Sequence, residues 1–193
     1  GWGHFLATAR DLNGDGYDDL VTGACGSGGT YDGVTYVAYG PLAGDVVAAA
    51  ADATISAEPD DSGQQACVVA FAGDLNSDGL TDLVVGAYLQ DAPDYDRGKV
   101  YVLNGPLWGA RDLSSSDAQV VGEAGQILSG ETVGSAGDVN GDGFPDLIIG
   151  NDWYEVGDDY EHDDGAAYLV YGPFAGTMDL TYAHAKFVGE SNL

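Results

Sequence analysis

Three short stretches of the sequence carry oxygen-bearing side chains on alternate residues. The first begins at Asp11, and the others begin 63 and then 64 residues further along, at Asp74 and Asp138. In each stretch Asp, Asn, Asp and Asp occupy positions 1, 3, 5 and 9, and glycine occupies position 6. Hard divalent cations such as Ca²⁺ bind six to eight oxygens, and a turn with oxygens on alternate residues can surround one. The pattern therefore predicts a calcium-type site in each stretch.

The expected ligands are the four side chains and the backbone carbonyl of position 7, where the residue type varies. Glycine at position 6 permits the sharp turn. No soft ligand is present, so zinc or copper would fit poorly. A metal-free turn is the alternative, because Asp, Asn and Gly favour turns in any case, but three matching copies favour the metal. The predicted ligands of three Ca²⁺ per chain are Asp11, Asn13, Asp15, Tyr17 and Asp19; Asp74, Asn76, Asp78, Leu80 and Asp82; and Asp138, Asn140, Asp142, Phe144 and Asp146.

An apolar run follows each loop and distinguishes it from the loops of helical calcium-binding motifs. EF-hand and dockerin-type loops begin in the same way, but they continue into a helix. Here the runs begin at Leu20, Leu83 and Leu147, are short, and contain many β-branched residues. Such runs are typical of buried strands. The cation is therefore expected in a turn between two strands.

Each loop belongs to a longer repeat that contains four predicted strands. One strand precedes the loop, the apolar run follows it, a third strand ends in Gly-Pro, and a weaker fourth strand comes last. No segment shows sustained helical periodicity. Tandem four-stranded antiparallel sheets predict an all-β fold, namely a β-propeller with three blades per chain. The repeats are expected at about 1–55, 56–120 and 121–186, with 187–193 beginning the next blade.

These residues resemble the FG-GAP repeats of the integrin α-subunit propeller and of bacterial relatives. The similarity rests on the glycine before the first strand, the Asp-x-Asn-x-Asp-Gly-x-x-Asp loop, and the Leu-Val-Val-Gly-Ala run from Leu83. The resemblance implies a propeller in which metal loops stiffen the blades on one face and ligands bind on the other. The sequence departs from the family at the "FG" pair, which is Trp2-Gly3, Gln65-Ala66 and Ser129-Gly130, and at the "GAP" triplet, which is Gly23-Ala24-Cys25, Gly86-Ala87-Tyr88 and Gly150-Asn151-Asp152.

The composition is strongly acidic. The 193 residues include 32 Asp and Glu but 5 Lys and Arg, giving a formal net charge of −27, while an apolar content of 45% supports a folded core. Such a charge argues against nucleic acid as a partner. Membrane insertion is not expected, because no apolar run reaches the roughly 18 residues of a transmembrane helix.

Cys25 and Cys67 are the two cysteines of the sequence. An even pair in an acidic, calcium-type chain fits a secreted or cell-surface setting and one disulfide. Two buried thiols are an equally open alternative. The chain begins with Gly1 and shows no signal peptide, which indicates a processed protein or a fragment.

The two ends of the sequence predict an assembly. A short motif that ends in a small residue and Glu precedes the second and third loops, as Ser56-Ala57-Glu58 and Val121-Gly122-Glu123. The first loop lacks this motif, but the sequence ends on another copy of it, at Glu190. Two chains joined head to tail would therefore form a six-bladed ring with closed two-fold symmetry. The alternative is that further blades belong to a longer protein.

The chain is expected to act as a binding, adhesion or assembly module and not as an enzyme. From the resemblance, a protein or carbohydrate ligand would bind opposite the metal loops, on segments 25–32, 88–97 and 151–164. The last two are acidic and aromatic, which suits a cationic or carbohydrate partner or a second cation. A solvated acidic loop is the alternative. No triad-like arrangement appears. The alternatives are an architectural subunit of a surface polymer and a non-catalytic part of a secreted hydrolase.

Overall fold

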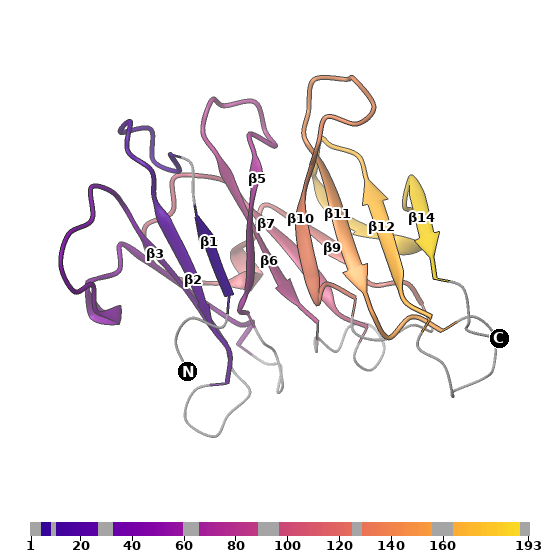
Figure 1. Cartoon of the computed structure of the whole chain (residues 1–193), viewed down its shortest axis with the longest axis horizontal. Coiled ribbons are helices and arrows are strands. Elements are labelled where there is room, and N and C mark those ends of the chain that lie inside the picture. The colour runs from indigo at the N-terminus through magenta and orange to yellow at the C-terminus, as the bar shows by residue number, and fades with distance from the viewer. Residues whose placement is uncertain are drawn as a thin grey trace.

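The computed structural model describes residues 5–8, 11–26, 33–59, 66–88, 97–124, 129–155 and 164–189. Within these residues the chain forms strands β1 to β14 and three one-turn 3-10 helices. The strands assemble into three sheets that lie one after another along the molecule (Figure 1). The prediction of an all-β fold is therefore confirmed.

Sheet 1 is built on the first repeat. Its antiparallel strands are β1 (Phe5–Thr8), β2 (Leu20–Ala24), β3 (Val34–Ala38) and β4 (Ala53–Ser56), paired in chain order. The 3-10 helix η1 (Ala48–Ala50) precedes β4. Three of the four strands are short runs of β-branched and small residues, as expected for strands that pack between layers.

Sheets 2 and 3 repeat this order. Sheet 2 contains β5 (Val68–Gly73), β6 (Asp82–Ala87), β7 (Lys99–Leu103) and β9 (Ala118–Val121), with η2 (Leu113–Ser115) before β9. Sheet 3 contains β10 (Thr132–Gly137), β11 (Asp146–Asn151), β12 (Ala166–Val170) and β14 (Ala185–Val188), with η3 (Leu180–Tyr182) before β14. The fourth strand of each sheet ends one or two residues beyond the expected repeat boundary.

Two sheets gain a fifth strand that the sequence did not predict. β8 (Gly109–Asp112) leaves the second repeat and pairs in parallel with β4 of sheet 1. β13 (Gly176–Asp179) leaves the third repeat and pairs in parallel with β9 of sheet 2. The described part of sheet 3 has four strands. Each of these short strands covers an edge that would otherwise expose unpaired backbone groups, and each interlocks a repeat with the one before it.

Two apolar cores lie between the sheets. The first, between sheets 1 and 2, includes Val21, Ile55 and Leu83, and the second, between sheets 2 and 3, includes Val84 and Leu147. All six residues of β6 are buried, because both faces of sheet 2 are covered. Leu83 and Val84 point to opposite faces of β6, as successive strand residues must, so one strand serves both cores.

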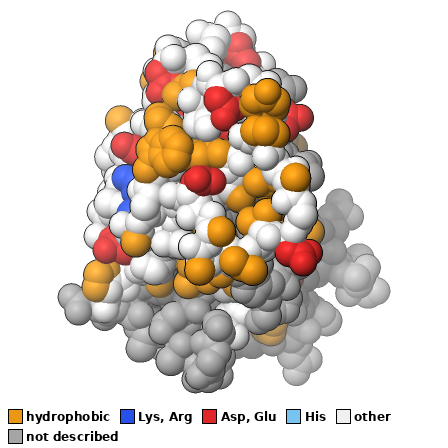
Figure 2. All heavy atoms as spheres, turned by 90° about the vertical axis from the view of Figure 1, so that its left-hand side faces the viewer, with side chains coloured by type: hydrophobic (Ala, Val, Ile, Leu, Met, Phe, Trp, Pro, Cys, Tyr) orange, Lys and Arg blue, Asp and Glu red, His pale blue; other side chains and the backbone are white. Residues whose placement is uncertain are grey.

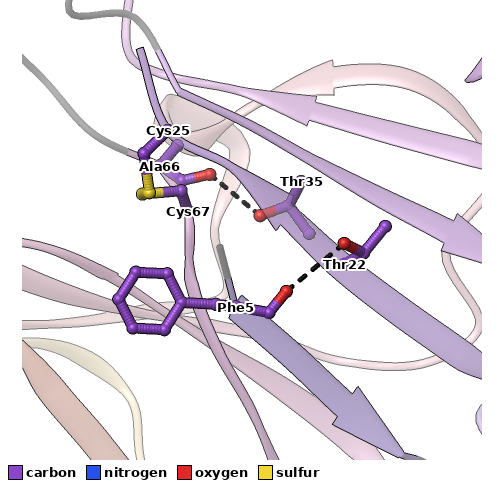
Figure 3. The surroundings of a disulfide bond; sticks show 6 residues. All are labelled: Phe5, Thr22, Cys25, Thr35, Ala66 and Cys67. Carbon is purple, nitrogen blue, oxygen red and sulfur yellow. Dashed lines mark hydrogen bonds between the residues drawn. A yellow bond between two sulfur atoms is a disulfide. The ribbon is translucent and has the colours of Figure 1, made fainter. Parts of the chain in front are cut away.

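A disulfide joins sheet 1 to sheet 2. Cys25 follows β2 and Cys67 precedes β5, and their Cα atoms lie 5.3 Å apart (Figure 3). Beside it, the Thr35 hydroxyl donates a hydrogen bond to the carbonyl of Ala66 over 2.9 Å. Gly23 makes this approach possible, since a Cβ there would lie 1.8 Å from the Cys67 carbonyl oxygen. The disulfide, which the sequence left open, is therefore present.

Candidate metal site

The three acidic loops connect the first and second strands of each sheet, so they lie at the same end of the strands in all three sheets. Glycine at position 6 has a φ of 88° in Gly16, 90° in Gly79 and 96° in Gly143. Side chains with a Cβ rarely adopt this left-handed conformation. Position 4 is also left-handed, with Ser77 in the second loop at a φ of 63°. The sequence thus folds each loop into the same tight turn.

The aspartate at position 1 anchors each loop through its carboxylate. In the first loop, Asp11 Oδ1 accepts hydrogen bonds from the N–H groups of Gly14 (2.6 Å) and Asp15 (3.0 Å). Asp11 Oδ2 accepts one from Gly16 over 2.8 Å. Asp74 and Asp138 repeat the bonds to positions 5 and 6 at 2.9 to 3.0 Å. The backbone therefore converges on this carboxylate, and the loop shape depends on it.

Positions 3 and 5 are joined to each other and to position 7. The amide of Asn13 donates to Asp15 Oδ2 over 3.0 Å, and Asn13 Oδ1 accepts from the Asp15 N–H over 3.0 Å. Tyr17 N–H donates to Asp15 Oδ1 over 2.9 Å. The other two loops repeat all three bonds at 2.8 to 2.9 Å, through the residues Asn76, Asp78, Leu80, Asn140, Asp142 and Phe144.

The aspartate at position 9 differs from the other loop side chains because it is buried. Asp19, Asp82 and Asp146 are 4%, 0% and 0% exposed. In each, Oδ2 accepts a backbone hydrogen bond from loop position 2, over 2.6 to 2.7 Å. Oδ1 accepts a hydrogen bond, over 2.9 to 3.1 Å, from the N–H of the glycine that follows the third strand. This residue ties the loop to the sheet, a role that the sequence analysis did not assign.

The local electrostatics favour a bound cation. Burial raises the pKa of Asp82 to about 6, and the neighbouring carboxylates Asp78 and Asp74 raise it further, against two backbone hydrogen bonds. Burial likewise raises the pKa of Asp19. At Asp11 desolvation is outweighed by the loop N–H groups, so its pKa lies below the usual value. Ionisation of Asp82 and Asp19 therefore costs more than that of an exposed carboxyl, and a nearby positive charge would lower this cost.

The residues present fit a hard divalent cation in their chemistry. Every side chain at positions 1, 3, 5 and 9 offers oxygen, and a carboxylate oxygen that accepts one N–H retains a second lone pair. In the described residues, no group of three or more His, Cys, Asp or Glu side chains is arranged as a metal cage. The loops bring the predicted residues together, while coordination itself, including the carbonyl at position 7, stays a prediction.

The opposite end of the strands, away from the acidic loops, is described only in part. Residues 27–32, 89–96 and 156–163 of the expected ligand-binding segments lie outside the described residues, as do Trp2, Gly3 and Gln65 of the expected "FG" pairs, and so does Glu190. Among the described residues, the side chains of Glu131 and Asp152 share a hydrogen bond. This bond and, to a smaller extent, burial raise the pKa of Glu131 to about 7. This pair is the clearest electrostatic feature that the sequence analysis missed.

Two repeated polar contacts also connect neighbouring sheets. Tyr101 of sheet 2 donates its hydroxyl to Glu58, which follows sheet 1, over 3.0 Å. Tyr168 of sheet 3 donates its hydroxyl to Glu123, which follows sheet 2, over 2.8 Å. Glu58 and Glu123 therefore connect the sheet that each follows to the next sheet along the chain.

The described part of the chain contains no helix long and apolar enough to cross a membrane. The three 3-10 helices span three residues each. Such short turns belong to the connections before the fourth strands.

Comparison with known proteins bears on the whole repeat. The family model described as FG-GAP repeat matches residues 2–37, 68–103 and 129–170. The chain is 32% identical to integrin alpha-5 of Xenopus laevis over 152 residues and 33% identical to human integrin alpha-7 over 163 residues, which is 76% and 78% of this chain. It is 36% identical to bovine phosphatidylinositol-glycan-specific phospholipase D over 161 residues, or 78% of the chain. These matches span 14%, 12% and 18% of the relatives' lengths. The chain therefore belongs to the FG-GAP repeat family.

Proposed function

We propose that this chain is a calcium-stabilised, extracellular β-propeller module that serves binding or adhesion. The observation that carries the proposal is the threefold recurrence of one hydrogen-bonded loop with oxygen side chains at the same positions. Ca²⁺ at each loop would offset the repulsion among its carboxylates and hold the turn between the first two strands. The sheets would then be successive blades around a common axis.

The experiment compares thermal unfolding of the chain in millimolar Ca²⁺ and in excess chelator. With a dissociation constant of about 10⁻⁴ M, as in extracellular modules, each site would add about 1.4 kcal/mol at about 1 mM Ca²⁺. The Tm should therefore rise with Ca²⁺. An unchanged Tm, together with no calorimetric binding signal, would reject calcium as the stabilising ion.

A pair of variants in the first loop makes this test specific. Asp15→Asn removes a charge at a predicted ligand, and Asp18→Asn removes the same charge from an exposed neighbour in the same loop. Asp15→Asn should lower the calcium-dependent part of the Tm, while Asp18→Asn should preserve it. Equal effects of the two variants would indicate a general response to charge.

We further propose that the module has no catalysis of its own and that a second copy completes its ring head to tail, giving six blades. A protein or carbohydrate ligand would bind the end opposite the metal loops. Two integrin α chains among the relatives support a binding or adhesion role. The native mass in Ca²⁺ tests the ring, because a dimer should have twice the mass of the 19.8 kDa chain.

The similarity to a phospholipase D supports a second candidate, a non-catalytic part of a secreted hydrolase. An architectural subunit of a surface polymer is the third. Electron microscopy at rising Ca²⁺ separates them, because a polymer subunit would form filaments and a hydrolase module would remain discrete.

A further inference from the structure

Sheet 3 exposes an apolar face whose counterparts are buried elsewhere in the molecule. Val139, Ile148 and Phe187 are 54%, 41% and 62% exposed. Their counterparts one repeat earlier, Leu75, Val84 and Val120, are 2%, 0% and 1% exposed and lie in the core between sheets 2 and 3. The residue types are similar, so what differs is the covering sheet. This open face of sheet 3 is therefore built to receive another sheet.

Sheet 1 carries the matching surface on the side turned away from sheet 2. Leu6 on this side is 66% exposed, while its counterpart Val69 is 7% exposed. Apolar side chains gather on this side (Figure 2), and they form a groove of about 270 Å³. In sheets 2 and 3 the same side packs on the preceding sheet. The residues that line the groove include Leu6, Tyr36, Val46 and Val47.

A segment near sheet 1 and the free edge of sheet 3 also correspond to a strand pair that is seen elsewhere in the molecule. β8 and β13 each begin at a glycine with positive φ, three residues after a proline, and each pairs with the preceding sheet. In the first repeat the same place belongs to the segment from Gly44, whose φ is 70°, to Val47, and this segment is not part of any sheet. The edge of β14 in sheet 3 likewise has no strand beside it among the described residues.

We propose that the Gly44–Val47 segment of one copy pairs in parallel with β14 of a second copy, while the open face of sheet 3 covers the groove of sheet 1. The proposal rests on the ring completion proposed above and names the surfaces that would carry it. Adding a strand to an open edge supplies backbone hydrogen bonds, and the groove supplies the apolar contact. A second copy suits the site, because the chain contains both halves of the joint.

The observed pairs fix the register of the new one. β8 pairs Gly109 with Ala53, and β13 pairs Gly176 with Ala118. The same register places Gly44 opposite Ala185 of the second copy, and Asp45 opposite Lys186. Asp45 would thus lie beside Lys186, whose ammonium already pairs with Glu123 over 2.7 Å, so the register rests on the backbone pairing and not on this charge pair.

The first experiment places cysteines at one register pair. Val47→Cys combined with Val188→Cys should form a disulfide between copies, because neighbouring strands lie about 4.8 Å apart. A bond within one copy is excluded by distance, since sheets 1 and 3 lie at opposite ends of the molecule (Figure 1). Non-reducing gels should show mainly covalent dimer or larger species. The matched control is Val47→Cys with Phe187→Cys. Its two cysteine side chains would point to opposite faces of the joined sheet, so it should cross-link several-fold less.

The second experiment charges the open face. Phe187→Glu should convert the assembly to single chains in millimolar Ca²⁺, as measured by sedimentation equilibrium. Tyr182→Glu makes the same charge change at a residue that is 76% exposed, and its counterpart Ser115 is exposed in the internal repeat, so it should leave the assembly intact. Both residues are exposed, and circular dichroism should show that both variants fold.

The outcomes separate this inference from the proposed function. If the wild-type chain assembles but the register pair cross-links no better than its control, the strand pairing is wrong and another contact completes the ring. If the wild-type chain has the mass of one copy at high concentration, the proposal that a second copy covers sheets 1 and 3 is wrong. Neither result bears on the proposal of a calcium-stabilised module, which is tested separately by the Tm in Ca²⁺ and in chelator.

Discussion

The two interfaces between neighbouring sheets share one set of contacts and differ in another. Both have an apolar core and a buried tyrosine that donates its hydroxyl to a glutamate just after the last strand of the preceding sheet. The first interface, between sheets 1 and 2, adds the Cys25–Cys67 disulfide. The second, between sheets 2 and 3, has Tyr88 and Glu131 at the corresponding repeat positions. The two interfaces therefore share their apolar and tyrosine–glutamate contacts and differ at the positions of the disulfide.

Replacing the disulfide should produce the largest loss. Cys25 and Cys67 are 42 residues apart, and opening a loop of that length costs about 4 kcal/mol in the chain-entropy account. The double variant Cys25→Ser and Cys67→Ser should lose that much unfolding free energy in urea. Reductant should lower the stability of the wild-type chain and leave that of the variant unchanged. A loss below about 1 kcal/mol would show that the two interfaces are held alike.

The ion pair between the second and third repeats should come next. Arg97 is buried, and its guanidinium lies 2.6 Å from Asp179, so Asp179→Ala leaves a buried charge without this partner and should cost about 3 kcal/mol. Asp112 is the matched control, because both aspartates accept a hydrogen bond at the start of a 3-10 helix. Asp112→Ala should cost about 1 kcal/mol, the value of a cap. Equal losses of unfolding free energy for the two variants would show that the Arg97–Asp179 ion pair adds nothing beyond the helix cap.

The shared tyrosines should give equal and smaller effects. Tyr101 and Tyr168 are fully buried, and each donates one hydroxyl hydrogen bond to a glutamate. Tyr101→Phe and Tyr168→Phe should each cost about 1 kcal/mol of unfolding free energy. Tyr17→Phe, at a residue 53% exposed, should cost nothing measurable. Unequal losses at the two buried positions would mean that the contact is repeated in geometry but not in energy.

The smallest expected effect is a pH dependence of stability at Glu131, which belongs to the second interface. The pKa of Glu131 is raised to about 7 by its hydrogen bond with Asp152 and by burial. The folded chain therefore holds this proton more tightly than the unfolded chain. Its stabilising effect is full below the ordinary carboxyl pKa and is lost as the pH rises through about 7. Glu131→Gln should flatten the fall in urea midpoint over that range, and an unchanged slope would contradict the assignment.

The sequence was informative wherever local chemistry repeats. Asp11, Asp74 and Asp138 marked three turns, and the apolar runs after them became β2, β6 and β11. The Gly-Pro signal closed the third strands. These features are readable because their cause lies within a few residues: oxygens that accept nearby N–H groups, and β-branched side chains that favour a pleated surface.

The missed features depend on contacts between distant repeats. Gly109–Asp112 and Gly176–Asp179 have no alternating apolar pattern, and they become strands only because an edge of the preceding sheet lies beside them. The recurring glycine three residues after each Gly-Pro was the available signal. Asp82 was predicted as a ligand from its spacing, but its burial and its bond to Gly105 follow from tertiary packing.

The parallel strands β8 and β13 have a consequence for how the chain loses its structure. Each belongs to one repeat by sequence and to the previous sheet by hydrogen bonding. Deleting the second or third repeat would therefore remove a strand from the preceding sheet. A truncated chain that ends at a sheet boundary would expose unpaired backbone groups at the edge of its last sheet. Melting at one end should also propagate inward, which favours concerted collapse of the array over stepwise peeling of one unit at a time.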